Sequence, residues 1–154
     1  MNAEQFERLV REVDEQITGE QRQRAIHEAH GALDHYHQTL QSWSAAATRK
    51  VQASQQLSNV KGILEAARAE AVQEAYLTGE INGKNADERS RAETIFLDRL
   101  GRNGSQYATA LRAFQTEQVA YDQAALEESI AGEELKAAKY RCSLCQAALQ
   151  ALSE

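Results

Sequence analysis

Apolar residues recur at every third or fourth position over most of this chain, which is the spacing of amphipathic α-helices. The first stripe of this kind comprises Phe6, Leu9, Val10, Val13 and Ile17. Thr18 and Gly19 follow it, and glycine favours the position just past the end of a helix. The pattern therefore predicts a short N-terminal helix or arm over residues 1–18.

A second helical stretch is predicted over residues 20–78. Its first part has heptad-like spacing at Ile26, Leu33, Tyr36, Leu40, Trp43 and Ala47. Its second part continues with the a/d spacing of a coiled coil at Leu57, Val60, Leu64, Ala67 and Ala71. The residues around position 44 fit either a bend or an unbroken helix, so the stretch is one very long helix or two helices.

The clearest interruption lies at residues 79–85, where Asn82-Gly83 is a turn signal. A short helix is predicted over residues 86–100, with apolar positions at Ala92, Ile95, Phe96 and Leu100. A glycine-containing segment ends it, and a last helix is predicted over residues 105–152. The apolar stripe of that helix comprises Tyr107, Leu111, Phe114, Val119, Leu126, Ile130, Ala137, Leu144 and Ala148.

The composition supports an all-α fold in a single helical domain, residues 1–154. The chain has 154 residues and no proline, which would break helix interiors at about 3 kcal/mol each. The predicted architecture is a long antiparallel helical hairpin, a coiled-coil-like bundle with a short helix at the turn. Much of the apolar fraction is alanine, which contributes little transfer free energy, so we expect a homo-oligomer to complete the thin core.

The net charge of −6 argues against generic duplex DNA binding, which depends on neutralising phosphates with Lys and Arg. A membrane span needs about 20 consecutive apolar residues, and no run in the sequence approaches that length. The N-terminus does not resemble a signal peptide, so a cytoplasmic location is expected. The last helix carries an acidic segment that could receive a basic partner, at Glu127, Glu128, Glu133 and Glu134. Trp43 is either a packing anchor or an interface residue.

The interruption at residues 79–85 offers one candidate ligand site. The helix that follows begins with free N–H groups and a partial positive charge. Cations and a possible cap lie around this start, so an anion or nucleotide could bind at Lys84, Asn85, Arg89 and Arg91. The alternative is purely structural, with Asn85 as N-cap and Glu88 completing a capping box. The spacing of the glycines does not fit a phosphate-binding P-loop.

The histidines and cysteines give two further candidates. On a helix, His30, Asp34 and His37 share one face, where they could hold a transition metal, or they are incidental polar residues of an exposed face. Cys142 and Cys145 have the spacing of half a zinc site, but the other half is missing from the sequence. Free thiols, a redox pair or a metal shared across a dimer remain open for them.

The segment Glu74–Arg89 resembles a turn found in small helical proteins of tailed bacteriophages and prophages, Gly-x-Ile-x-Gly-Lys-Asn-x-x-x-Arg. The matching residues are Gly79, Ile81, Gly83, Lys84, Asn85 and Arg89. The likeness extends as a pattern over residues 51–149, but only the turn is specific. Most such proteins have no assigned activity, so the resemblance implies a phage accessory protein in the bacterial cytoplasm and implies no reaction.

No nucleophile–base arrangement is apparent, so we expect a protein that is not an enzyme and needs no cofactor. The leading expectation is a phage accessory protein that binds a host or phage component, to counter host defence or to modulate replication. One alternative is an oligomeric sponge that sequesters a small anionic nucleotide. A second alternative is a metal-binding protein that uses the histidine cluster from His27 to His37.

Overall fold

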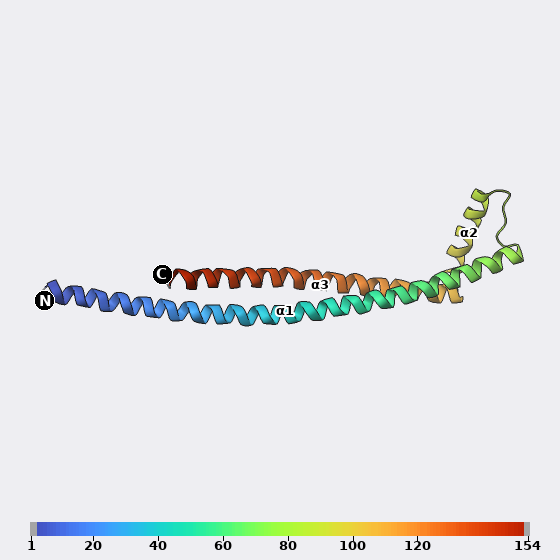
Figure 1. Ribbon diagram of the computed structural model, residues 1–154. Coiled ribbons are helices and arrows are strands. Elements are labelled where there is room, and N and C mark those ends of the chain that lie inside the picture. Colours follow the sequence, from blue (N-terminus) through green and yellow to red (C-terminus); the bar gives the residue numbers. More distant parts are fainter. Residues whose placement is uncertain (1–2, 153–154) are drawn as a thin grey trace. The chain divides into compact units, whose positions relative to one another are not determined.

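The computed structural model describes the backbone of residues 3–152, and their side chains except those of residues 3, 4, 6 and 17. It contains three helices in this range, labelled in Figure 1: α1 (Ala3–Thr78), α2 (Ala86–Leu100) and α3 (Gln106–Ala151). No strand occurs in this part of the chain, which confirms the all-α prediction. No helix within it is both long enough and apolar enough to span a membrane.

Helix α1 runs through Thr18 and Gly19 without interruption, so the predicted helix end at these residues is wrong. It also passes position 44 as one helix, which resolves the alternative of two joined helices. The hydroxyl of Thr18 donates to the backbone oxygen of Asp14 at 2.8 Å and so leaves the helical backbone bonds in place. A single interior glycine costs only about 1 kcal/mol, which strong helix formers on both sides offset.

The fold divides into two compact units, and each contains part of α1 and part of α3. The first unit joins the residues up to Ala46 with those from Glu128 onward. Its helix segments are antiparallel, since Cys142 contacts Ala32 while Glu128 contacts Trp43 further along α1. The second unit, Ala47–Glu127, contains the remaining parts of these helices together with all of α2.

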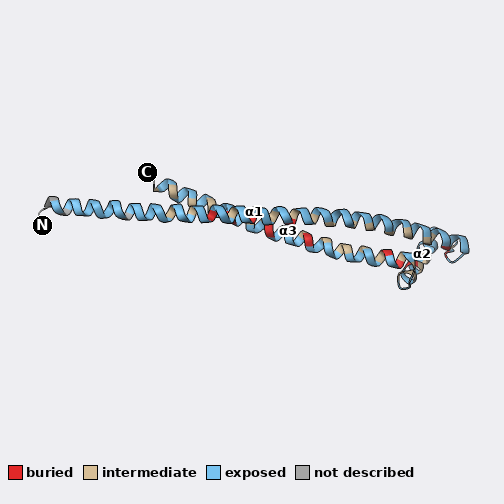
Figure 2. Cartoon of the chain, turned by 90° about the horizontal axis from the view of Figure 1, so that it is seen from below, coloured by how far each residue is buried: buried red, intermediate tan, exposed pale blue. Residues whose placement is uncertain are grey.

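The buried residues of the first unit are small ones. Figure 2 shows that buried residues are few along these helices, where most residues are exposed. Heptad-spaced residues are buried on α1 at Ala32, Thr39 and Ala46 and on α3 at Ala131 and Ala138. Among the large residues predicted to pack, Tyr36 and Trp43 are half-buried. The others lie exposed, at Ile26, Leu33, Leu40, Ile130 and Leu144. Small side chains permit a close approach of two helices, and the narrow contact of only two helices leaves the neighbouring stripes uncovered.

The second unit follows the sequence pattern more closely. Leu57, Leu64 and Phe114 are half-buried between α1 and α3, as their spacing predicts. In α2 the buried residue is Leu97, whereas Ile95, predicted as a packing position, is exposed. The second unit therefore buries larger side chains than the first, because α2 adds a third helix to its core.

Candidate functional site

The turn between α1 and α2 is built around a glycine and a buried isoleucine. Gly79 has a φ of +80°, in the left-handed region that favours glycine, and it ends α1. The chain then reverses, and the N–H of Ile81 donates to the backbone oxygen of Ala75 at 3.1 Å. The side chain of Ile81 is 2% exposed, so it anchors the turn against the helices. These contacts give Gly79 and Ile81 of the turn motif a structural role.

The start of α2 is closed by the predicted capping box. The N–H of Glu88 donates to Oδ1 of Asn85 at 2.9 Å, and the N–H of Lys84 donates to Oε2 of Glu88 at 2.7 Å. The guanidinium of Arg89 donates to the backbone oxygen of Gly83 at 3.4 Å. A Cβ at Gly83 would lie 2.8 Å from the backbone nitrogen of Arg89, so only glycine fits there. The predicted N-cap is thus confirmed, and Glu88 completes it by accepting from Lys84, the residue before the N-cap.

The cations proposed for an anion site lie at this turn but do not enclose a cavity. Lys84 takes part in the cap through its backbone N–H, and its side chain is exposed. Arg91 is also exposed, and Arg89 bonds to its own turn. Asp87 and Glu88 in the first turn of α2 already favour its positive end. Anion binding at these residues stays a prediction, and it would have to occur on an exposed surface.

The histidine candidates lie along one exposed helix. His30, Asp34 and His37 of α1 are all exposed, and the ring of His37 lies 5.9 Å from that of Tyr36. Within the described residues, no three His, Cys, Asp or Glu side chains converge in an arrangement that could hold a metal ion. Metal binding at these residues therefore stays a prediction to be tested by elemental analysis.

The cysteines belong to the helix seam of the first unit. Cys142 and Cys145 are free thiols and half-buried. The thiol of Cys142 donates to the backbone oxygen of Ala32 at 3.2 Å, across from α3 to α1. Cys142 therefore acts here as a small packing residue with a weak donor.

Trp43 also packs inside the first unit. Its side chain is half-buried, and its indole N–H donates to Oε1 of Glu128 at 3.3 Å. It lies beside Gly132 of α3, where a Cβ would come within 3.7 Å of the indole ring. Of the two alternatives for Trp43, the packing anchor is the one that the geometry supports.

The other acidic candidates on α3 differ in their partners. Glu127 forms an ion pair with Arg49 at 3.5 Å within the second unit. Glu133 pairs with Lys136 on the same helix at 2.6 Å. The carboxylate of Glu134 has no ion pair or hydrogen bond among the described residues, so it is the member of this set that remains available to a partner.

A groove at the three-helix end of the second unit was not anticipated from the sequence. It has a volume of about 560 Å³ and lies between the end of α1, the end of α2 and the start of α3. Its lining includes buried or half-buried apolar residues from all three helices, namely Ala71, Ala75, Phe96, Leu100 and Tyr107. The contribution of three elements makes it a concave surface in which these apolar residues lie among polar and charged ones.

The groove carries an excess of negative charge. Arg99, the basic residue of the lining, lies 2.9 Å from Glu80 and 5.9 Å from the centre of the Phe96 ring, so its charge is already paired. The carboxylates of Glu70 and Glu74 have no ion pair or hydrogen bond within residues 3–152. These two acids lie four positions apart on α1, and neighbours at this spacing share one helix face.

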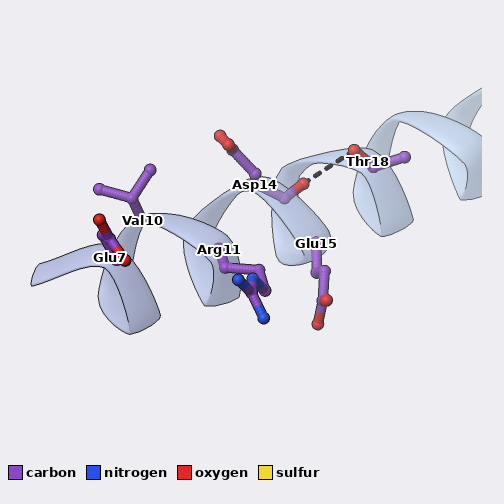
Figure 3. A pocket seen from close by; sticks show the side chains of 6 residues that line it. All are labelled: Glu7, Val10, Arg11, Asp14, Glu15 and Thr18. Atoms are coloured by element: carbon purple, nitrogen blue, oxygen red, sulfur yellow. Dashed lines mark hydrogen bonds between the residues drawn. The ribbon is translucent and has the colours of Figure 1, made fainter. Parts of the chain in front are cut away.

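Two other concave regions are less enclosed. One lies along the start of α1, where Figure 3 shows all six lining side chains on a single helix, among them Glu7, Arg11 and Glu15. One helix cannot surround a ligand, so this region is an exposed helix surface. The other is a smaller depression of about 310 Å³ in the second unit, and its lining includes Arg49 and Glu127, which form an ion pair.

Sequence reasoning missed Glu70 and Glu74 because they stand within a strongly predicted helix. The available signal was the pair of like charges four positions apart with no base beside them, which an isolated helix disfavours. Comparison of the chain with protein-family models, with curated proteins and with solved structures finds no match. The functional argument therefore rests on the geometry of the described residues.

Proposed function

We propose that this chain is a non-enzymatic accessory protein that binds a basic segment of a protein partner in the groove of the second unit. One observation carries the proposal: the groove between α1, α2 and α3 combines apolar residues with two carboxylates, Glu70 and Glu74, that have no ion pair or hydrogen bond among the described residues. A concave surface that offers apolar contact and a few converging charges is a common form of a binding site.

The chemistry of the groove favours an arginine or lysine side chain. The aliphatic stem of such a residue can pack on Ala71 and Phe96, while its charged head reaches the carboxylates. A guanidinium is planar and bears several donors, so it can bridge Glu70 and Glu74. Binding would also relieve the repulsion between these acids, which amounts to about 0.2–0.5 kcal/mol on an isolated helix.

The biological setting of the proposal comes from the resemblance of the Gly79–Arg89 turn to phage and prophage proteins. That resemblance supports a phage-encoded protein acting in the bacterial cytoplasm on a host or phage component. Counteracting a host defence and modulating replication both require binding alone, so either role fits a protein without a catalytic centre.

The experiment that tests the groove uses a labelled basic helix as the probe. The probe is a fluorescein-labelled, alanine-based peptide with arginines four residues apart, and fluorescence anisotropy gives its Kd for the full chain. Glu70→Gln with Glu74→Gln should weaken binding by about tenfold or more, because each charge-assisted hydrogen bond contributes about 1.5–3 kcal/mol.

A matched control separates the groove from general acidity. Gln55→Lys with Asn59→Lys changes the net charge by the same amount on an exposed part of α1 that does not line the groove. Binding that persists in this control and is lost in the groove variant supports the proposal. Equal weakening in both variants, or no measurable binding to the unmodified chain, contradicts it.

A further inference from the structure

An apolar stripe on α3 of the first unit is left uncovered by the chain itself. It consists of Ile130, Ala137, Tyr140 and Leu144, which we call the outer α3 stripe. At 3.6 residues per turn these positions fall within about 80° of one another around the helix, and the arc also contains Glu133, which is paired with Lys136. The exposed fractions are 53% for Ile130, 67% for Tyr140 and 53% for Leu144.

The outer α3 stripe is separate from the internal seam. The seam of α3 in this unit uses Ala131 and Ala138, which are both buried. Each lies one position after a stripe residue, and successive residues are rotated by about 100° around a helix. The stripe therefore faces away from α1, and more than half of each of its large residues stays exposed.

Two charges of opposite sign flank the stripe on either side of Ala137. Glu134 precedes Ala137 and Arg141 follows it, whereas Glu133 is paired with Lys136. Glu134 and Arg141 lie seven positions apart on the same flank, and neither side chain has a hydrogen bond or ion pair among the described residues. A surface of this kind is complementary to itself when one copy is reversed.

We infer that the outer α3 stripe binds the same stripe of a second copy of this chain, in an antiparallel pair related by a two-fold axis beside Ala137. In this arrangement Glu134 of each copy lies opposite Arg141 of its partner, since residues on the same flank face each other across an antiparallel pair. Such a contact is isologous, as in most homodimers.

A parallel pair related by a two-fold axis would not bring these charges together, because it places the same flank of the two helices on opposite sides of the interface. The contacts between Glu134 and Arg141 are therefore specific to the antiparallel pair. The small side chain of Ala137 also suits the axis, where the two helices approach most closely. The contact uses the first unit only, so it is independent of the groove proposed above.

Sedimentation equilibrium of the full chain tests the inference through a charge exchange. The unmodified chain is expected to form a dimer, and Glu134→Arg or Arg141→Glu alone should raise its dissociation constant by about tenfold or more, because each creates like-charge contacts. The double variant Glu134→Arg with Arg141→Glu should restore dimerisation to within about threefold, because both pairs are re-formed in reverse.

A second pair of variants tests the apolar part and its specificity. Leu144→Glu should produce monomers, whereas Leu33→Glu on the exposed surface of α1 should leave the dimer intact. Circular dichroism checks that both variants keep their helix content. A chain that is monomeric at all concentrations, a dimer insensitive to both single charge changes, or dissociation by Leu33→Glu but not by Leu144→Glu overturns the inference. A monomer that binds the basic peptide would leave the groove proposal standing.

Discussion

The indole N–H of Trp43 donates to a carboxylate oxygen of Glu128 at 3.3 Å, and this bond joins α1 to α3 within the first unit. Trp43 fits at this place because Gly132 leaves room for its ring. Since Trp43 is the only tryptophan of the chain, its fluorescence reports directly on the packing of this unit.

The space beside Trp43 predicts that Gly132→Ala stabilises the protein. The added Cβ would lie 3.7 Å from the indole ring, which is an ordinary van der Waals distance. Replacing an interior helical glycine by alanine contributes about 0.5–1 kcal/mol. Urea unfolding monitored by Trp43 fluorescence measures the change, with Gly31→Ala as a control in open space. A loss of stability in Gly132→Ala, with a gain in the control, would show that the space beside Trp43 is too small for a Cβ.

The turn between α1 and α2 predicts the opposite result for another glycine. Gly83→Ala should lower the free energy of unfolding by about 1–3 kcal/mol, because its Cβ would lie 2.8 Å from the backbone nitrogen of Arg89. Gly62→Ala, in open space on α1, should instead stabilise the chain. Thermal unfolding by circular dichroism compares the two, and equal effects of both substitutions would refute the close approach at Gly83.

Loss of the N-cap of α2 gives a third prediction. Asn85→Ala removes the acceptor for the Glu88 N–H and should cost about 1 kcal/mol. Asn85→Asp and Asn85→Ser should retain most of the stability, because both side chains can accept the same bond. Chemical denaturation of the three variants tests this ordering, and an alanine variant as stable as the serine variant would argue against a role for the cap.

Short-range signals in the sequence were sufficient to predict α2 and its cap. The bounds of α2 depend on Asn85, Glu88 and Gly101. Each of these residues bonds to a partner only a few positions away in the sequence. The end predicted at Thr18 and Gly19 failed, because one glycine is too weak a signal against long helix-forming flanks.

Long-range packing was harder to predict. In the first unit two stripes compete for the same helix, one of large residues such as Leu33 and one of small residues such as Ala32. Periodicity identifies both stripes but does not show which one faces α3. The groove could not be predicted from the sequence for a similar reason. Its lining residues Glu74, Phe96 and Tyr107 come from three helices and meet only in the folded chain.

The histidines of α1 yield a fourth prediction. Protein purified without metal-affinity resin should contain no stoichiometric transition metal by elemental analysis, because His30, Asp34 and His37 are exposed on a single helix. One metal ion per chain, lost in His30→Ala with His37→Ala but retained in His35→Ala, which lies off this helix face, would instead establish the metal-binding alternative.

The cations near the turn allow the nucleotide alternative to be decided. Lys84 contributes its backbone N–H to the cap, so Lys84→Glu should preserve that bond and change the stability by no more than about 0.5 kcal/mol. Adenine and guanine mononucleotides, linear and cyclic, should not raise the melting temperature, because Glu88 and Asn85 already accept from the N–H groups at the start of α2. A concentration-dependent rise that Lys84→Glu and Arg91→Glu abolish, but Lys61→Glu leaves unchanged, would mean that these exposed cations bind an anion without a preformed pocket. In that case the turn would be a ligand site as well as a cap.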